Sequence, residues 1–555
     1  MAFLRQDQKG NEVYLRICET ERQGKKVVQR TLHSLGKKSD YNPESLSRIG
    51  AQLYCMNGNS LEDLMQGMCK EQGRYNYGFP LIIKYLIDQY ELDDVFESIR
   101  KKHKFTFSLT EIVTLLLCNR WNKPLSKLGV YETQNDYLGL VPIKLQWLYR
   151  SLDILSVSSE QIQKYIYNKN TQLLDYKVDV VFYDVTTFYF DSDYEEQGAL
   201  RQKGFGKDGK IGKTQILLGL LLDKQRNPIA YELYSGETYE GHTLVEGLKK
   251  LKEKYKIDKV VVVADSGMLN KDNLLAINDK GYEFIVGERL KNLPKTVQSE
   301  LLDRQNYKPM TLEKHGKISE KIVLTYHIVT YKGRKILCTY SEKRAKKDRI
   351  ERETKIEKAK EMMKKPAVLG KKAAIYYLKG NQVDTDTGEV TDPKTTKIVY
   401  ELDQNRIDRA AQYDGLKAIA TSDKTLSNED ILLTYKELYK IEQSFRTFKS
   451  FLETRPMFHW TDARIKGHFC MCYLSFALLN YLQQILKKNN LDYSENDIRK
   501  ILDKMQVSHL KQFKQDYYVR SQLNEDTKKL LKMLEIKPLP DMMANPLIIN
   551  YLQKM

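Results

Sequence analysis

The sequence predicts an α/β fold, and the order of segments in residues 176–290 indicates which kind. Three strongly apolar β runs follow one another, and the first of them is VDVVFYDVTTFYF at 178–190. A helix, a short apolar strand, a second helix and a last strand come next. These six further segments lie at 213–223, 228–236, 243–254, 259–265, 271–279 and 282–289. Three strands, helix, strand, helix and strand is the order of an RNase H-like fold.

The flanking segments differ from this core in their residue patterns, and these differences divide the chain into six parts. Residues 1–42 alternate as a basic β-hairpin region, and the next part is predicted to be helical. It is a candidate DNA-binding domain, and a generic helical bundle without a helix-turn-helix signature is the alternative. In that part Ser108 and Glu111 form a capping box before an apolar run. The whole division is 1–42 hairpin region, 43–175 helical domain, 176–290 first part of the core, 291–410 β-rich insertion, 411–490 second part of the core with the Glu442 helix, and 491–555 C-terminal tail.

The insertion follows from spacing as well as from texture. Asp184 and Asp265 are 81 residues apart, whereas Asp265 and Glu442 are 177 apart (265 − 184 and 442 − 265). The second gap is too long for a minimal core. Strand-like runs fill it: LTYHIVTY and RKILCTY come before a charged helix of mixed sign at 343–365, and AAIYYLK and KIVYEL come after it. An ordinary solvent-exposed helix with no role in binding is one interpretation of that charge pattern.

Composition restricts the class of partner. The net charge is +18, from 91 basic and 73 acidic residues, which favours a polyanionic partner. A general lysine bias is the alternative. Seven cysteines without a CxxC pair indicate neither a disulfide framework nor a zinc site, and they suit a reducing cytoplasm. The apolar stretch 469–486 contains Ser, Asn and Gln residues, so a buried helix is expected there rather than a membrane span.

The stretch 427–449 is predicted as one helix that begins with the Ser427 cap. At 100° per residue, one narrow stripe carries Tyr435, Glu442, Arg446 and Lys449. The stripe therefore combines an aromatic hydroxyl, a carboxylate and two cations. A solvated face with ion pairs between neighbouring turns is the alternative interpretation.

Two further carboxylates belong to strongly apolar β runs. Asp184 lies inside its run, where a carboxylate is costly without a cation, and Asp265 ends KVVVVAD. A turn or capping role is the alternative for Asp265. Two aspartates at strand ends and one helical glutamate, Glu442, are the oxygen ligands that a site for two Mg²⁺ ions needs for phosphoryl transfer.

With these motifs in this order, the chain resembles a DDE transposase of the bacterial insertion-sequence type. The resemblance rests on YDVTT around Asp184, ADSGM around Asp265, RPMFHWTDARIKGH, and a Tyr…Glu…Lys signature at Tyr435, Glu442 and Lys449. The signature has an Arg three residues after the Tyr. This sequence departs from it with Leu438.

The resemblance implies cut-and-paste movement of the insertion sequence that encodes the protein. Asp184, Asp265 and Glu442 are expected to be catalytic and to hold two Mg²⁺ ions, for which Mn²⁺ can substitute. Tyr435, Arg446 and Lys449 are expected to contact the DNA backbone. End cleavage through a hairpin and strand transfer are implied, on double-stranded transposon ends and target DNA, by a homodimer in the DNA complex. The site of action is then bacterial DNA in the cytoplasm. No GxxxxGK[ST] loop is present, so no nucleotide cofactor is expected.

Two other functions remain open from the sequence. An RNase H-like nuclease or resolvase would use the same chemistry, but the long insertion and the signature register count against it. A catalytically dead, transposase-derived DNA-binding protein is the second alternative. The presence of all three carboxylates counts against that protein, and Leu438 counts for it.

Overall fold

The computed structural model describes residues 2–23, 26–56, 58, 69–175, 177–190, 198–204, 214–239, 242–255, 257, 261–268, 271–314, 320–363, 376–384, 396–455, 457, 459–512 and 515–544. The chain forms two compact units. The first contains Met1–Tyr77, Lys504–Leu531 and Ile536–Met555, and the second contains Gly78–Asp503 and Lys532–Glu535.

The first unit begins with a three-stranded antiparallel sheet in the order β1-β2-β3. Its strands are β1 (Ala2–Lys9), β2 (Glu12–Gln23) and β3 (Lys26–Lys37), and α1 (Pro43–Cys55) follows with Asn42 as its cap. A two-stranded hairpin was predicted here, and β1 was missed. Its sequence AFLRQDQK is mostly polar, and among the residues of the sheet whose burial is described only Leu15 and Cys18 are fully buried, so little periodic signal marks the first strand.

A second sheet in this unit joins residues from both ends of the chain, in the order β19-β18-β17-β4. Its members are β4 (Cys69–Asn76), β17 (Gln506–Gln512), β18 (Gln515–Arg520) and β19 (Met542–Ala544). The C-terminal segment also forms α18 (Glu525–Met533). The prediction of helix alone for residues 43–175 is therefore wrong at β4. This strand is polar, and its pairing with β17 is a long-range contact that local sequence does not encode.

Helices dominate the start of the second unit, as predicted. They are α3 (Gly78–Gln89), α4 (Leu92–His103), α5 (Leu109–Asn122), α6 (Lys127–Thr133), α7 (Leu145–Val157) and α8 (Ser159–Leu174). The Ser108 cap is confirmed, because its hydroxyl accepts a hydrogen bond from the Glu111 backbone N–H at 3.2 Å.

The long apolar helix α16 (Asp462–Lys488) packs against α5, α7 and α8. By length and composition it could cross a membrane, but 83% of its most apolar window is buried inside the protein. The Trp121 indole N–H donates to Ser475 of α16 at 2.9 Å. The helix is thus a core element, as its polar residues indicated.

The central sheet of the second unit confirms the RNase H-like fold. Neighbouring strands run in the order β8-β7-β5-β9-β10, with β5, β9 and β10 parallel and β7 and β8 antiparallel to their neighbours. The strands are β5 (Val180–Tyr189), β7 (Thr214–Asp223), β8 (Pro228–Ser235), β9 (Val261–Ala264) and β10 (Glu283–Glu288), and the short β6 (Gln202–Lys203) also pairs with β7.

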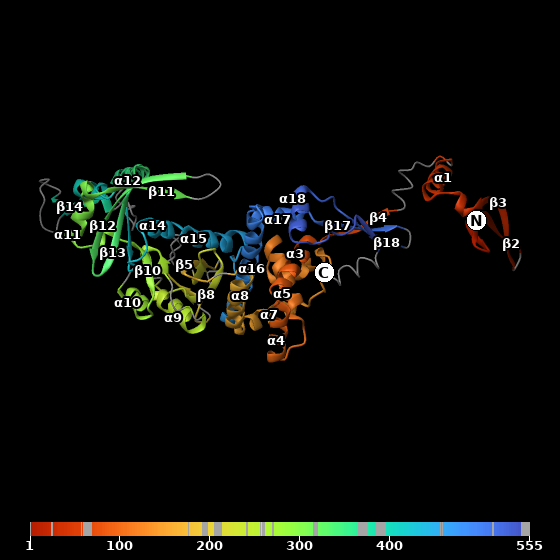
Figure 1. Ribbon diagram of the computed structural model, residues 1–555, viewed down its shortest axis with the longest axis horizontal. Helices are drawn as coiled ribbons and strands as arrows, with labels where there is room; N and C mark the ends of the chain where they lie inside the picture. Colours follow the sequence, from red (N-terminus) through yellow and green to blue (C-terminus); the bar gives the residue numbers. More distant parts are fainter. Residues whose placement is uncertain are drawn as a thin grey trace. The chain divides into compact units, whose positions relative to one another are not determined.

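Helices cover both faces of this sheet (Figure 1). On one face lie α9 (Thr243–Tyr255) and α10 (Lys271–Asp279), where Leu244, Leu248 and Ile277 join Tyr183 and Val185 in one core cluster. On the other face lie α14 (Asn428–Lys436), α15 (Tyr439–Arg446) and α16, and the Phe188 and Phe469 rings stack edge to face at 5.2 Å between centroids. Successive residues of β5 therefore face different partners, and Asp184 shares the α15 side with Phe188.

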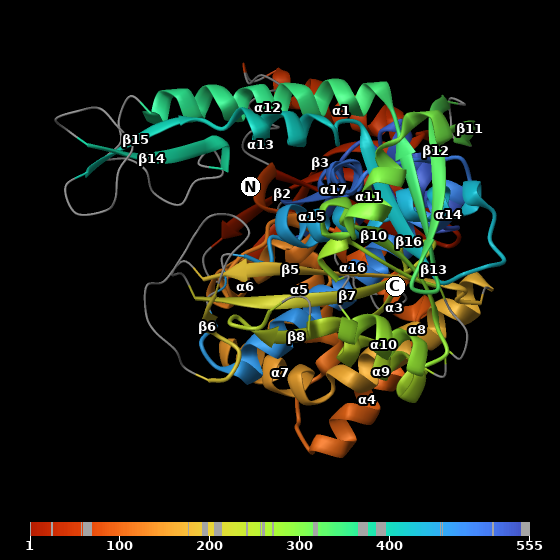
Figure 2. The same ribbon diagram turned by 90° about the vertical axis from the view of Figure 1, so that its left-hand side faces the viewer.

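The predicted β-rich insertion is confirmed, and part of it extends the central sheet. Strand β16 (Leu416–Thr421) pairs with β10 and with β13 (Arg334–Tyr340), and β12 (Glu320–Tyr331) and β11 (Lys308–Lys314) continue outward. Helix α11 (Lys295–Leu302) packs on β12. The charged helix α12 (Glu342–Met363) lies beside the hairpin of β14 (Leu378–Asp384) and β15 (Thr396–Leu402), near α13 (Gln404–Ala411) (Figure 2).

Candidate active site

The two aspartates predicted to be catalytic fall in one row of the sheet. Strands β5 and β9 are parallel neighbours, and Tyr183 pairs with Ala264, so Asp184 and Asp265 occupy the next row. Neighbouring strands lie about 5 Å apart, which brings the two backbones close together. Asp184 is half-buried, and its carboxylate accepts a hydrogen bond from the Val185 N–H at 2.8 Å. Asp265 is exposed, one residue beyond the end of β9.

The third predicted carboxylate, Glu442, lies on α15, which packs on β5. Its side chain is exposed. Among the described residues, no group of three or more His, Cys, Asp or Glu side chains is close enough to hold a metal ion. The three carboxylates thus come from the same side of the sheet without closing into a metal-binding cluster.

The helix that carries Tyr435 and Glu442 is not continuous, which corrects the prediction of one helix. It is divided into α14, α15 and the π-helix η9 (Thr447–Phe451). At the break, the Leu438 N–H donates to Tyr435 O at 3.2 Å and the Ile441 N–H donates to Leu438 O at 3.1 Å. These bonds span three residues rather than four and tighten the chain locally. The uniform stripe of 100° per residue therefore holds only within each piece.

Tyr435 interacts electrostatically with all three predicted catalytic carboxylates. Its side chain is buried, with 4% of its surface exposed. Burial raises the pKa of Tyr435. Asp265 raises it further, Arg344 lowers it, and Asp184 and Glu442 raise it again. The hydroxyl thus stays protonated at neutral pH and lies within electrostatic range of all three carboxylates. A protonated phenol there can donate a hydrogen bond to a phosphate oxygen.

Gly287 makes room for that hydroxyl, and the sequence analysis did not single it out. Gly287 follows Val286, which pairs with Ala264, so it extends the row of Asp184 and Asp265 onto β10. A Cβ at this position would lie 2.5 Å from the Tyr435 hydroxyl oxygen and 3.0 Å from the Ser266 backbone nitrogen. A glycine inside the strand pattern YEFIVGER was the signal for a close approach of this kind.

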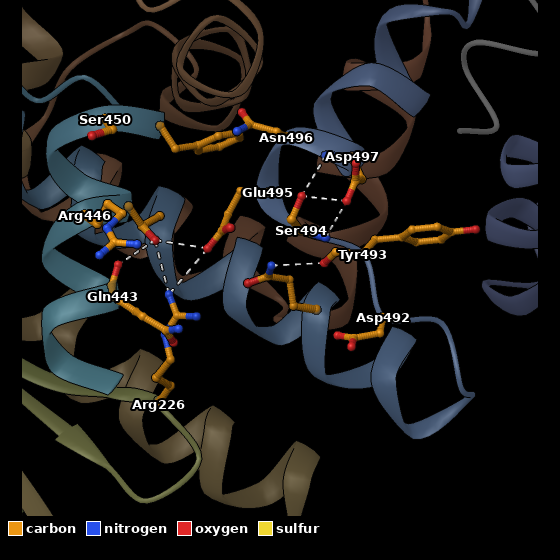
Figure 3. A pocket seen from close by; sticks show the side chains of 13 residues that line it. Arg226, Gln443, Arg446, Ser450, Asp492, Tyr493, Ser494, Glu495, Asn496 and Asp497 are labelled. Atoms are coloured by element: carbon orange, nitrogen blue, oxygen red, sulfur yellow. Dashed lines mark hydrogen bonds and ion pairs between the residues drawn. The ribbon is translucent and has the colours of Figure 1, made fainter. Parts of the chain in front are cut away.

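The opposite side of α15 is fixed to the β7–β8 turn and to α17 (Glu495–Asp503). The Arg226 guanidinium donates to Ser444 at 3.1 Å and to Thr447 at 3.2 Å, and its Nη2 lies 3.5 Å from Oε1 of Glu495 (Figure 3). Burial lowers the pKa of Arg226, and Glu495 opposes that shift. This half-buried arginine therefore anchors the helix that carries Glu442 to the β7–β8 turn and to α17.

The two predicted DNA-contacting cations lie in different surroundings. Lys449 lies in η9 with its ammonium 5.7 Å from the centre of the Phe188 ring of β5, on the same face of the sheet as Asp184. Arg446 instead lines a cavity of about 470 Å³ together with Arg226 and the first turn of α17 (Figure 3). Tyr435 and Asp265 do not line that cavity.

A second cavity, of about 580 Å³, opens beside Asp265 and Tyr435. Its other lining residues include four cations that the sequence analysis did not assign to the site: Arg289, Lys291, Arg344 and Lys417. These residues come from the loop after β10, from α12 and from β16. The insertion therefore supplies positive charge directly next to one of the predicted catalytic aspartates.

Comparison with known proteins assigns the family. The family model described as transposase DDE domain matches residues 176–478, which is more than half of the chain. The chain belongs to this DDE transposase family. The match begins just before β5 and ends within α16, so it contains the two aspartates, the insertion and Glu442.

Solved structures of transposases give only weak likenesses. The piggyBac transposase synaptic complex with hairpin DNA is 9% identical over 85% of this chain and 82% of that chain, with a TM-score of 0.33. The Mos1 transposase paired-end complex with left transposon end is 14% identical over 35% and 57%, with a TM-score of 0.14. Similarity at this level carries no argument about function. No match was found among curated protein sequences.

Proposed function

We propose that this DDE transposase cuts and pastes the insertion sequence that encodes it, with Asp184, Asp265 and Glu442 as its catalytic residues. The observation that carries the proposal is the row of Asp184 and Asp265 on adjacent parallel strands, with the Tyr435 hydroxyl in electrostatic range of both and of Glu442. Family membership supports DNA strand cleavage and transfer as the reaction class.

The ligand chemistry of the three carboxylates fits two Mg²⁺ ions, with Mn²⁺ as a substitute, because hard divalent cations prefer oxygen ligands. When bound, such ions lower the pKa of the attacking hydroxyl and stabilise the leaving oxygen. The exposed Glu442 side chain is then the ligand that must turn toward the aspartates.

The remaining residues of the site act on the DNA. The protonated Tyr435 hydroxyl donates to a non-bridging phosphate oxygen beside the cut, held in place by the contact at Gly287. Lys449, whose ammonium lies over the Phe188 ring, contacts the DNA backbone further along β5. Arg446 approaches a phosphate from the side of α17.

In the proposed reaction, water attacks the phosphodiester at the transposon end and releases a 3′-hydroxyl on one strand. That hydroxyl attacks the opposite strand, which forms a hairpin and frees the flanking DNA. After the hairpin is opened by water, the same 3′-hydroxyl attacks the target phosphodiester. Each step either hydrolyses a phosphodiester bond or transfers it to a new hydroxyl, so no nucleotide cofactor is consumed.

The proposed partners are double-stranded transposon ends and target DNA, bound by a homodimer within the bacterial cytoplasm. The net charge of +18 supports a polyanionic partner. A homodimer brings two ends together, which excision as a unit requires.

The test uses labelled duplexes that carry the inverted repeat flanking the gene, under single-turnover conditions with Mg²⁺. We expect cleavage at the repeat boundary by the wild type. Ala substitution of Asp184, Asp265 or Glu442 should abolish cleavage while DNA affinity stays within a few-fold. Near-normal cleavage by Asp184→Ala would contradict the assignment, and sequence-independent nicking without strand transfer would indicate a nuclease instead.

A further inference from the structure

Two cations, one from the insertion and one from β16, line the cavity beside Tyr435. The Lys417 ammonium lies 4.6 Å from the centre of that ring, and Arg344 lines the same cavity as Lys417, Tyr435 and Asp265. Lys417 is the exposed side chain of β16, and Arg344 lies in the first turn of α12. The two residues are 73 positions apart in sequence (417 − 344), so only the folded protein brings them together.

Hydrogen bonds connect the start of α12, which carries Arg344, to the turn before β16, which carries Lys417. The Gly415 N–H donates to the Asp348 carboxylate at 3.0 Å, and the Ser341 N–H donates to Gly415 O at 3.1 Å. Gly415 has a φ of +78°, and a Cβ there would lie 2.6 Å from the Tyr340 ring, so the start of α12 fits closely against the turn before β16. These contacts join the segment that carries Arg344 to the one that carries Lys417.

The carboxylates near this pair are Asp348, which contacts Arg344, and Asp265, a proposed metal ligand that lines the same cavity. Arg344 lies 3.5 Å from Asp348, and that contact is half-exposed. Exposed pairs of this kind contribute at most about 1 kcal/mol. Among the described residues Lys417 makes no ion pair with a carboxylate within 4 Å. Two cations at one cavity mouth repel each other, and an anion in the cavity relieves that repulsion.

Given the proposed function, we propose that Arg344 and Lys417 together bind the DNA phosphate next to the scissile one, on the insertion side of Tyr435. The guanidinium offers a planar fork for two phosphate oxygens, and the ammonium supplies a point charge. On the Tyr435 stripe itself, Leu438 offers no cation one turn before Glu442. Helix α12 of the insertion and strand β16 thus supply the substrate contact at this place.

The experiment compares Arg344→Ala, Lys417→Ala and the double variant in single-turnover cleavage of the labelled end duplex. The matched control is the double variant Lys346→Ala and Arg349→Ala, which removes the same charge from exposed positions on another face of α12. We expect each single variant to cleave about tenfold more slowly, equal to about 1.4 kcal/mol, and the control to stay within twofold. Arg344→Lys should recover part of the rate.

A second arm identifies the phosphate. A neutral methylphosphonate replaces one phosphate at a time next to the cut. In the wild type, one neutral position should slow cleavage about tenfold, and in the Arg344→Ala, Lys417→Ala double variant the same position should have no further effect. Equal slowing in both proteins, or an unchanged rate in the double variant, overturns the inference while leaving the proposed function intact.

The two proposals fail in different ways. If the wild type does not cleave, the proposed function is wrong. If the variants do not fold, the methylphosphonate scan of the wild type and Arg344→Lys decides, because a contacted phosphate must slow the wild type and must lose part of its effect in Arg344→Lys.

Discussion

The contact between Gly287 and Tyr435 allows a prediction with a magnitude. In Gly287→Ala, the new Cβ would lie 2.5 Å from the Tyr435 hydroxyl oxygen, whereas ordinary contacts begin at 3.4 Å. The hydroxyl must therefore move by about 0.9 Å (3.4 − 2.5). Gly287 does not have a positive φ, so the backbone itself accepts Ala, and the contact alone determines the effect. Because the ring is buried, the hydroxyl moves only if α14 moves with it.

Misplacing a catalytic group by about 1 Å can slow a reaction about 100-fold, which is about 2.7 kcal/mol in activation free energy. We expect Gly287→Ala to slow single-turnover cleavage of the labelled end duplex by about that factor, with DNA affinity nearly unchanged. The control is Gly267→Ala in the loop after β9, where a new Cβ meets no atom within 4 Å.

A double-mutant cycle tests the cause of the slowing. Tyr435→Phe removes the oxygen that the new Cβ would meet, so Gly287→Ala should cost much less in that background. A small residual effect is expected from Ser266, whose backbone nitrogen lies 3.0 Å from the new Cβ. A wild-type rate in Gly287→Ala, or the same loss with and without the Tyr435 hydroxyl, would refute the reasoning.

Three further outcomes are expected. The logarithm of the affinity for the end duplex should fall steeply and linearly with the logarithm of salt concentration, and a flat profile would contradict the electrostatic interpretation of the +18 charge. Arg446→Ala should slow cleavage about tenfold or more, and adding Leu438→Arg should restore part of the rate; an unchanged rate would remove Arg446 from the site. Burial lowers the pKa of Lys127 from 10.5 to about 7, so folding releases a proton and stability should rise from pH 7 to 10.5 by up to about 1.4 kcal/mol per pH unit. Lys127→Met should raise the urea midpoint at pH 7 and remove that slope, and a pH-independent wild-type midpoint would argue against a neutral buried lysine.

Much of the catalytic domain could be predicted because its signals are local. Asp184 interrupts an apolar strand, Asp265 ends another, and the order of strands and helices alone placed both at one edge region of an RNase H-like sheet. The parallel pairing of β5 and β9 then follows from the fold, and with it the shared row of the two aspartates.

What could not be predicted depends on long-range contacts or on weak local energies. No Gly or Pro marks the break after Lys436, because a few three-residue hydrogen bonds suffice to divide the helix. Arg344 comes from the insertion and Lys417 from β16, and the two residues line one cavity only in the folded protein. Strand β4 pairs with β17, more than 400 residues away in sequence, and its polar residues carry no strand pattern. Gly287 is the exception, since a glycine inside a strand was a usable signal.

The central claim is that Asp184 binds the catalytic metal ion, and a change of ligand tests it most directly. Asp184→Cys replaces a hard oxygen ligand by a softer thiolate, which Mn²⁺ accepts better than Mg²⁺ does. We expect Asp184→Cys to be inactive in end cleavage with Mg²⁺ and to regain measurable activity with Mn²⁺, while Asp184→Ala stays inactive with both ions. Cleavage by Asp184→Ala at a near-normal rate, or equal activity of Asp184→Cys with the two ions, would contradict the claim.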